Sequence, residues 1–307
     1  MNWDSQYVQR LVATALEEDI GAGDATVLAT IPARATGTAR ILAREDLVCA
    51  GLPMAERVFR ALDPAMKIEL HVHASDPVNK GTVLLHLEGK ARAILTGERT
   101  ALNFLGRLCG IATMVHHFVE AIQGTRARIR DTRKTTPGLR LLEKYAVKAG
   151  GGTNHRIGLY DAILLKENHI ALAGGVKQAL DQAHAYSALH FKPEALSAYE
   201  EAVPSRAPDT VLPIQIEVRD QRELREALSA GAESVLLDNM TPAEAQECVV
   251  LARSLRQDCV VEISGGITLE NVRAYAETGA DFLSSGTLTH SAPAANLSLL
   301  VDSIEDK

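Results

Sequence analysis

From residue 127 onward the sequence alternates short apolar runs with longer amphipathic stretches, and this alternation constrains the fold more than any other feature. It predicts strands at residues 127–131, 162–166, 214–218, 234–238, 260–264 and 281–285, and helices at residues 139–149, 176–185, 222–230, 243–254 and 269–278. Parallel neighbours need a crossover connection, usually a helix, so this order indicates a parallel sheet. The number of units favours a closed or nearly closed α/β barrel, and a doubly wound sheet is the alternative.

Polar side chains end several of these strands. Glu217, Asp238 and Ser264 are 21 and 26 residues apart, a plausible length for one strand and one helix, and Lys166 ends an earlier strand. In barrels the C-terminal ends of the strands carry the active site, whereas strand interiors hold Val, Ile and Leu. Burying such charges unpaired would cost roughly several kcal/mol each. A functional mouth shared by these four residues is therefore the better interpretation.

Glycine and hydroxyl residues follow the last two predicted strands. There, backbone N–H groups can cradle an oxyanion, and barrels often bind phosphate in the loops after their final strands. The phosphate-binding candidates are Ser264, Gly265, Gly266, Ser284, Ser285 and Gly286.

A basic segment lies within an acidic chain. Between Arg126 and Lys166, Lys and Arg outnumber Asp and Glu by ten to three, although the whole chain carries a net charge of −7. This concentration suggests a focused site for a compact polyanion, although a solvated basic helix face explains part of it. The acidic total argues against nucleic-acid or membrane-surface partners.

Targeting and redox signals are weak. No apolar run approaches the ~18 residues of a membrane span, and the N-terminus lacks the features of a signal peptide, so we expect a cytoplasmic protein. Cys49, Cys109, Cys248 and Cys259 form no CxxC pair and no zinc-site spacing, so we expect reduced, buried thiols.

The first part of the chain predicts a smaller unit. An apolar stripe from Val8 to Leu16 has helical spacing. Strand-like runs follow at residues 37–43, 66–73 and 82–88, with a helix at residues 54–61. His71 and His73 share a predicted strand face, but no third ligand accompanies them. Ordinary exposed residues are therefore preferred over a metal site.

Three further segments bear on domain organisation. Residues 92–118 predict a long helix that bridges two domains, with Gly106 and Gly110 allowing close approach of another segment. Residues 185–212 interrupt the strand and helix rhythm and predict an insertion, either a lid or a surface excursion. Residues 295–304 predict a short closing helix.

The basic segment supplies suitable anion ligands. Arg133 and Arg156 offer planar forks that match carboxylate and phosphate, whereas Lys134 and Lys166 offer point charges and His155 a hydrogen bond. Glu217 and Asp238 suit Mg²⁺, sugar hydroxyls or a cationic transition state. Arg99 lies among apolar or small neighbours and needs a partner; an ion pair within the fold would also satisfy it.

These motifs together resemble the quinolinate phosphoribosyltransferase family. The resemblance rests on GERTALN around Arg99, DTRKTTPGLR, KAGGGTNHRIGLYDAILLKENH, LLDNM, EISGGI and GADFLSSGTLT. It implies an α/β fold with an N-terminal α/β sandwich at residues 1–112, to which residues 289–307 return. It also implies an incomplete (open), type II phosphoribosyltransferase-like α/β barrel at residues 113–288, and a homodimer in which Arg99 reaches the neighbour's site.

The resemblance also assigns roles to the matching positions. Quinolinate and phosphoribosyl pyrophosphate would be bound by Arg99, Thr132, Arg133, Lys134, His155, Arg156, Lys166, Glu217 and Asp238. The catalytic residues would be Lys134, Lys166, Glu217 and Asp238. Mg²⁺ would bind through pyrophosphate, with Glu217 and Asp238 on the same side. The implied reaction joins the pyridine nitrogen to the ribose, with loss of pyrophosphate and CO₂, in NAD biosynthesis.

Two departures and three alternatives accompany this expectation. The family often has an acid where this chain has Gln215, and residues 185–212 are longer than expected. A related transferase could use nicotinate or another base without decarboxylation. A Schiff-base aldolase could use Lys166 as its nucleophile. A non-catalytic anion-binding protein is the third alternative.

Overall fold

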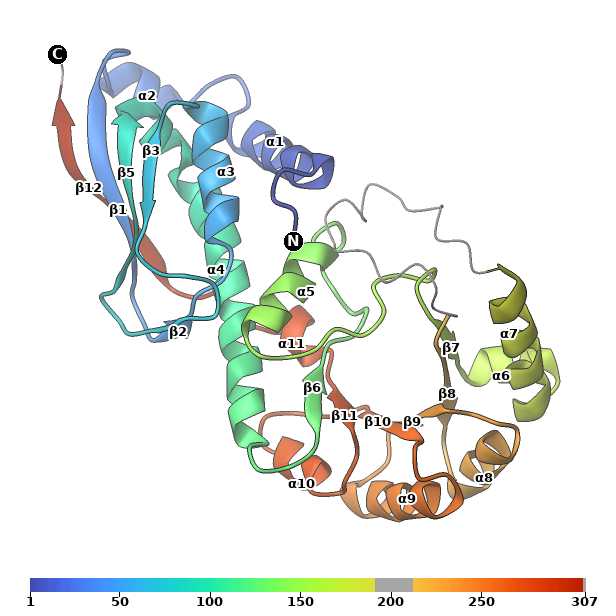
Figure 1. Cartoon of the computed structure of the whole chain (residues 1–307). Coiled ribbons are helices and arrows are strands. Elements are labelled where there is room, and N and C mark those ends of the chain that lie inside the picture. Colours follow the sequence, from blue (N-terminus) through green and yellow to red (C-terminus); the bar gives the residue numbers. More distant parts are fainter. Residues whose placement is uncertain (191–211, 306–307) are drawn as a thin grey trace.

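In the computed structural model, which describes residues 1–190 and 212–305, the alternating second half folds as one parallel sheet (Figure 1). Its strand order is β6-β11-β10-β9-β8-β7, and every neighbouring pair is parallel. The strands are β6 (Arg128–Arg130), β7 (Ile163–Leu165), β8 (Ile214–Val218), β9 (Ser234–Asp238), β10 (Val260–Ser264) and β11 (Phe282–Ser284). Among the described residues β6 and β7 are the two edges of the sheet, so the predicted barrel is an open one.

Local sequence signals place the barrel helices. Thr241 and Glu244 form a reciprocal capping box at the start of α9, with a proline in its first turn, and Asp220 caps α8. The helices are α5 (Arg140–Ala149), α6 (Glu167–Ala173), α7 (Val176–His190), α8 (Gln221–Ser229), α9 (Pro242–Leu255), α10 (Val272–Ala276) and α11 (Thr287–His290). Residues 269–278 were expected to be one helix, of which only α10 is helical.

The N-terminal unit is an antiparallel sheet packed against helices (Figure 1). Its strand order is β12-β1-β5-β3. Its elements are α1 (Gln6–Ile20), α2 (Ala25–Thr30), β1 (Thr36–Ala43), β2 (Leu47–Val48), α3 (Leu52–Leu62), β3 (Lys67–Leu70), β4 (Pro77–Val78), β5 (Val83–Lys90) and β12 (Leu297–Glu305). The short strands β2 and β4 pair with each other. The four cysteines are free and buried, as predicted.

The expected closing helix is wrong, because this segment is strand β12. It pairs antiparallel with β1 from Leu297 to Glu305. A short apolar run such as Leu297 to Val301 fits helical and strand patterns about equally well. The unpaired edge of β1 decides between them, because pairing satisfies the backbone groups of both strands.

The long helix α4 (Ala91–Ala121) runs from the N-terminal sheet to the barrel (Figure 1). The expected boundary at residue 112 therefore falls inside a continuous helix. Gly106 and Gly110 allow the predicted close approach: a Cβ atom at Gly110 would lie 1.9 Å from the Pro293 carbonyl oxygen. The backbone of Ala295 also donates a hydrogen bond to the Gly106 carbonyl at 2.8 Å. The chain thus crosses α4 on its way back to β12.

No helix in the described part of the chain is both long and apolar enough to cross a membrane.

A buried ion pair fixes the start of the barrel. Lys144 Nζ of α5 lies 2.6 Å from Asp131 Oδ1, and the two side chains are 2% and 0% exposed. Asp131 also accepts a hydrogen bond from the His155 backbone at 2.7 Å. Burial raises the pKa of Asp131 to about 6 against the lowering effect of Lys144, and burial lowers the pKa of Lys144. One carboxylate thus joins the end of β6, helix α5 and the following loop.

We predict that Lys144→Met lowers the free energy of unfolding by about 3–5 kcal/mol, because it leaves the Asp131 carboxylate buried without its cation. Urea denaturation measures the loss. Lys177→Met is the matched control, since Lys177 lies at the same 2.6 Å from Asp181 but these side chains are 65% and 56% exposed. Exposed pairs contribute little, so equal losses in the two variants would contradict the prediction.

Candidate active site

The C-terminal ends of the barrel strands enclose a cavity of about 450 Å³. Strand register aligns its wall: Asp238 lies beside Ser264, and Ser264 beside Ser284. The predicted site residues that line it are Thr132, Arg133, Lys134, His155, Arg156, Lys166, Asp238, Ser264, Gly265, Gly266, Ser284, Ser285 and Gly286. Of the predicted set, only Arg99 and Glu217 do not line this cavity.

The cations of the cavity are short of partners. Among the described residues, the side chains of Arg133 and Lys134 make no hydrogen bond or ion pair, and the Nε atoms of Arg133 and Arg156 are buried without a partner. Burial lowers the pKa of the Arg156 guanidinium, and the charge of Arg133 acts in the same direction. Buried, unsatisfied donors are costly. A bound anion would satisfy them.

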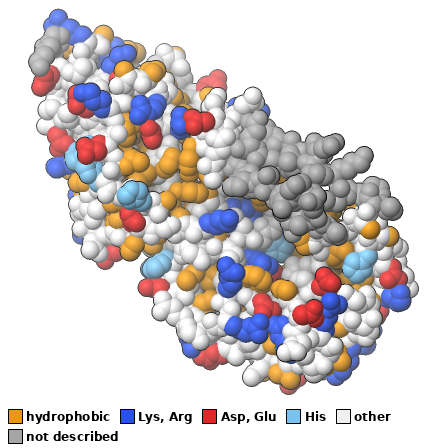
Figure 2. All heavy atoms as spheres, viewed as in Figure 1, with side chains coloured by type: hydrophobic (Ala, Val, Ile, Leu, Met, Phe, Trp, Pro, Cys, Tyr) orange, Lys and Arg blue, Asp and Glu red, His pale blue; other side chains and the backbone are white. Residues whose placement is uncertain are grey.

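The basic segment serves the cavity only in part. Lys144 is paired with Asp131, and Arg140 donates to the Thr135 hydroxyl and the Ile157 carbonyl. The expectation that the cations of this segment face the site is therefore wrong for six of the ten, which do not line the cavity: Arg126, Arg128, Arg130, Arg140, Lys144 and Lys148. Lys144 and Arg140 instead hold the loops that carry Arg133, Lys134 and Arg156. On the face seen in Figure 2, Lys and Arg are interspersed with Asp and Glu rather than forming a continuous basic surface.

The acids lie at two depths. Asp238 is at the rim, where it accepts a hydrogen bond from Asn239 Nδ2 at 2.7 Å. Glu217 pairs in register with Leu236, two residues before Asp238, and accepts a 2.6 Å hydrogen bond from Lys166 Nζ. The sequence spacing predicts that both acids lie at the mouth of the barrel. In the structure, the register places Glu217 deeper than Asp238, and Glu217 contacts Lys166, which lines the cavity.

The two glycine turns depend on having no side chain at their centres. Gly265 and Gly266 have φ values of +100° and +63°. A Cβ atom at Gly265 would lie 2.2 Å from Asn239 Oδ1, and one at Gly286 would lie 2.9 Å from Lys134 Cδ. The glycines therefore let Asn239 and Lys134 pack directly against the turns, with Lys134 beside the second one.

A buried network that sequence reasoning did not predict lies beneath the cations. His155 Nδ1 accepts a hydrogen bond from the Arg156 backbone at 2.7 Å, so the neutral ring carries its proton on Nε2 and donates it to Gln215 Oε1 at 3.0 Å. Gln215 Nε2 donates to Glu262 at 3.0 Å, and Arg130 donates to the same oxygen at 2.8 Å. Burial lowers the pKa of His155, while Glu262 and Gln215 act in the opposite direction. Its neutral form fits this network.

Glu262 is the residue that sequence analysis missed. It is fully buried, it lines the cavity, and its Oε1 atom has no hydrogen-bond partner in the described part of the chain. A signal was available, because Glu262 is a charge inside the apolar run Val260 to Ile263. Such a residue needs a partner or a function.

Arg99 lies apart from the cavity of its own chain. It is an exposed residue of α4, and no hydrogen bond or ion pair joins it to the other described residues. The alternative explanation of an ion pair within the fold thus finds no support in the described part of the chain.

The site has few metal ligands of its own. In residues 1–190 and 212–305, no three His, Cys, Asp or Glu side chains around the cavity lie close enough to share one ion. Mg²⁺ prefers carboxylate and phosphate oxygens and keeps several waters. Asp238, which lines the cavity, therefore fits a Mg²⁺ ion that takes its other ligands from a bound phosphate, whereas Glu217 is held by Lys166 outside the cavity wall.

An open α/β barrel whose mouth combines unpaired cations, two glycine turns and separate carboxylates defines an enzyme site for a phosphorylated, anionic substrate. The chain matches the family model of the quinolinate phosphoribosyl transferase N-terminal domain over residues 24–109, and that of the C-terminal domain over residues 111–194 and 193–300. It belongs to the quinolinate phosphoribosyltransferase family, which confirms the resemblance drawn from its motifs.

Individual relatives cover most of the chain. A Bacillus subtilis protein named probable nicotinate-nucleotide pyrophosphorylase (carboxylating) is 39% identical over 282 residues, 92% of this chain and 89% of the relative. A Nicotiana tabacum protein named quinolinate phosphoribosyltransferase (decarboxylating) 1b is 37% identical over 305 residues, 95% of this chain and 81% of the relative. The solved structure of the nicotinate-nucleotide pyrophosphorylase from Francisella tularensis has a TM-score of 0.85 at 36% identity and covers 96% of both chains.

We predict that Gln215→Glu raises the pKa of His155. A carboxylate that accepts the Nε2 proton favours the charged imidazolium, and the added acid also lies beside Glu262. Titration of the histidine ring protons by NMR measures the shift. Gln257→Glu, on an exposed turn, is the control and should leave His155 unchanged. An unaltered His155 titration in Gln215→Glu would show that this contact does not set its pKa.

Proposed function

We propose that this chain transfers the phosphoribosyl group of phosphoribosyl pyrophosphate to quinolinate, giving nicotinate mononucleotide, pyrophosphate and CO₂ in the de novo synthesis of NAD. One observation carries the proposal: the side chains of Arg133 and Lys134 and the Nε atom of Arg156 have no partner among the described residues, and they line a cavity that also contains two glycine turns. This combination suits two anionic substrates, one of them phosphorylated. The names of the relatives support the same reaction.

Each part of the cavity matches one part of the substrates. Arg133 and Arg156 suit the two carboxylates of quinolinate, because their forks bind carboxylates bidentately. The glycine turns suit the 5′-phosphate of the ribose. Lys134, beside the second turn, and Lys166 suit the pyrophosphate, whose departure leaves negative charge to be stabilised. In these roles His155 and Thr132 would complete the binding of the pyridine ring.

The chemistry needs charges of both signs. The pyridine nitrogen attacks C1 of the ribose as the bond to pyrophosphate breaks, and the ribosyl centre becomes positively charged in the transition state. Asp238, which lines the cavity, and Glu217, which lies behind Lys166, are the carboxylates that would stabilise such charge. The pyridinium ring then stabilises the electron pair left at C2 when the C2 carboxylate departs as CO₂, and that carbon takes up a proton.

Mg²⁺ is the expected cofactor. When bound, it would neutralise the pyrophosphate, with Asp238 as the carboxylate at the cavity and Glu217 behind Lys166. We further propose that the enzyme is a cytoplasmic homodimer in which Arg99 serves the neighbouring subunit's cavity. An exposed arginine without a partner among the described residues is available for such a contact.

The two alternative reactions would require different features of the site. A Schiff-base aldolase would need the Lys166 amine free, but Lys166 Nζ donates to Glu217 at 2.6 Å. A transferase for nicotinate would not need cations for a second carboxylate.

We predict release of pyrophosphate and CO₂ only when quinolinate, phosphoribosyl pyrophosphate and Mg²⁺ are all present, with loss of activity in EDTA and recovery on adding Mg²⁺. Labelled CO₂ from carboxyl-labelled quinolinate measures the reaction. Absence of CO₂ from purified protein under these conditions would falsify the proposal. Equal pyrophosphate release with nicotinate would point to the related transferase, and borohydride trapping of a carbonyl compound on Lys166 to the aldolase.

We predict that Arg99→Ala and Lys166→Ala are each at least tenfold less active, because each removes a cation from the complete site. Mixed under conditions of subunit exchange, they should recover part of the activity, since half of the sites in a mixed dimer hold both residues. Each variant mixed with itself is the control. Lack of recovery, with exchange verified by differently tagged subunits, would contradict sharing of Arg99.

A further inference from the structure

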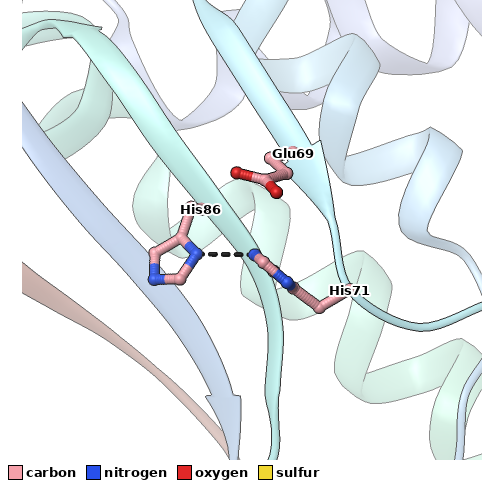
Figure 3. Close-up of side chains that lie close together, drawn as sticks. All are labelled: Glu69, His71 and His86. Carbon is pink, nitrogen blue, oxygen red and sulfur yellow. Dashed lines mark hydrogen bonds between the residues drawn. The ribbon is translucent and has the colours of Figure 1, made fainter.

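The N-terminal sheet carries a cluster of side chains of the kinds that ligate metal ions, outside the barrel. Glu69, His71 and His86 each offer a ligand atom, and these atoms all lie within 4.8 Å of one another. Figure 3 shows the two imidazole rings meeting edge to face, with the Glu69 carboxylate beside them. The Nε2 atom of His71 lies 2.6 Å from the Nδ1 atom of His86.

Backbone pairing fixes this arrangement. Glu69 on β3 is directly opposite His86 on β5. The His71 backbone continues the pairing, because its N–H donates to the Leu84 carbonyl at 2.9 Å. Glu69 and His71 are two residues apart, so they share one face of the strand. The sheet register therefore brings the three residues together on one face.

This face lies opposite the core of the unit. Leu85 and Leu87, which flank His86 along β5, are fully buried or nearly so. His86 therefore points to the other side of the sheet, where Glu69 and His71 are exposed and His86 is half-buried. The cluster is open to solvent and to any ion there.

The neighbouring charges on this face are already paired. Lys67 lies 2.7 Å from Glu88, and Arg40, opposite His86 on β1, lies 3.3 Å from Asp302. By contrast, the Glu69 carboxylate has no hydrogen-bond or ion-pair partner within the described ranges. One uncompensated carboxylate thus stands beside two imidazoles.

The sequence-based interpretation of this region is wrong in one respect. It paired His71 with His73 and found no third ligand. In the structure β3 ends at Leu70, and the His73 backbone turns to donate to Asp76 at 2.8 Å. The second histidine and the carboxylate come from β5 and from β3 itself, because only strand pairing brings His86 alongside His71.

We propose that Glu69, His71 and His86 bind a divalent first-row transition-metal ion, of which Zn²⁺ is the probe. Two imidazole nitrogens and one carboxylate form a ligand set for Zn²⁺ with one position left for water. Mg²⁺ is disfavoured, because it requires oxygen ligands in octahedral geometry. This site is separate from the proposed Mg²⁺-dependent chemistry and does not rest on it.

Binding requires only a small side-chain movement. Two nitrogens bound tetrahedrally to Zn²⁺ at ~2.0–2.1 Å lie about 3.3 Å apart, so the ion replaces the proton shared by the two rings and separates them slightly. The exposed His71 ring has room to rotate. The bound ion would join β3, an edge of its sheet, to β5, and so should stabilise the N-terminal unit against unfolding.

Equilibrium dialysis of the full chain against Zn²⁺ tests the proposal, with His71→Asn and His86→Asn as the two disruptive variants and His73→Asn as the matched control. We expect each disruptive variant to bind one equivalent less than the unchanged chain, and His73→Asn to bind the same amount. Excess Mg²⁺ should not displace this equivalent. Equal Zn²⁺ binding by all four proteins, or none by the unchanged chain, would overturn the proposal.

Thermal unfolding gives a second, independent measurement. Zn²⁺ should raise the unfolding temperature of the unchanged chain and of His73→Asn, but not that of His71→Asn or His86→Asn. Circular dichroism without metal should be alike for all four, since the substituted side chains are exposed or half-buried. A Zn²⁺-induced rise that persists in both disruptive variants would place the stabilising ion elsewhere and overturn the assignment.

Discussion

The register of the parallel barrel strands is the constraint on which the site depends. Hydrogen bonding sets Asp238, Ser264, Ser284 and Arg130 side by side on four neighbouring strands. Each strand then passes into its loop at about the same height, so side chains from distant parts of the sequence meet around one cavity. The same register places Glu217 beside Leu236, two residues before the end of β9, where its carboxylate accepts a hydrogen bond from Lys166. A slip of one residue would exchange the two faces of a strand and remove its polar side chains from the cavity.

Pairing of charges beneath the cavity explains why the cations at its surface remain available. Asp131, Glu143, Glu217 and Glu262 are buried, and each is paired with a cation: Lys144, Arg107, Lys166 and Arg130, respectively. These pairs neutralise the four buried acids. Arg133, Lys134 and Arg156 then face the cavity with donors that no other described residue uses, and a low-dielectric wall strengthens their attraction for an anion. An acidic chain can thus offer an anion a few cations that its own acids do not neutralise.

Two connections join the N-terminal unit to the barrel. Helix α4 joins it to the barrel, and the chain returns across Gly106 and Gly110 to place β12 beside β1. Arg99 lies exposed on α4, and the cluster of Glu69, His71 and His86 lies on the open face of the sheet. A metal at that cluster would stabilise an edge strand of the unit without involving the cavity.

The sequence by itself determined the strand positions of the parallel unit and most of the cavity wall, because strand and helix periodicity and the residues that end each strand are local properties. The openness of the barrel was implied only by the resemblance to the family. The family motifs also identified the cations and both glycine turns. Only the tertiary structure decided that residues 297–305 form a strand, since that depends on the free edge of β1. It also decided the depth of Glu217, the network of His155, Gln215 and Glu262, and the meeting of His71 with His86. Each of these depends on which strands pair and in what register, and residues far apart in sequence carry no local signal of that pairing.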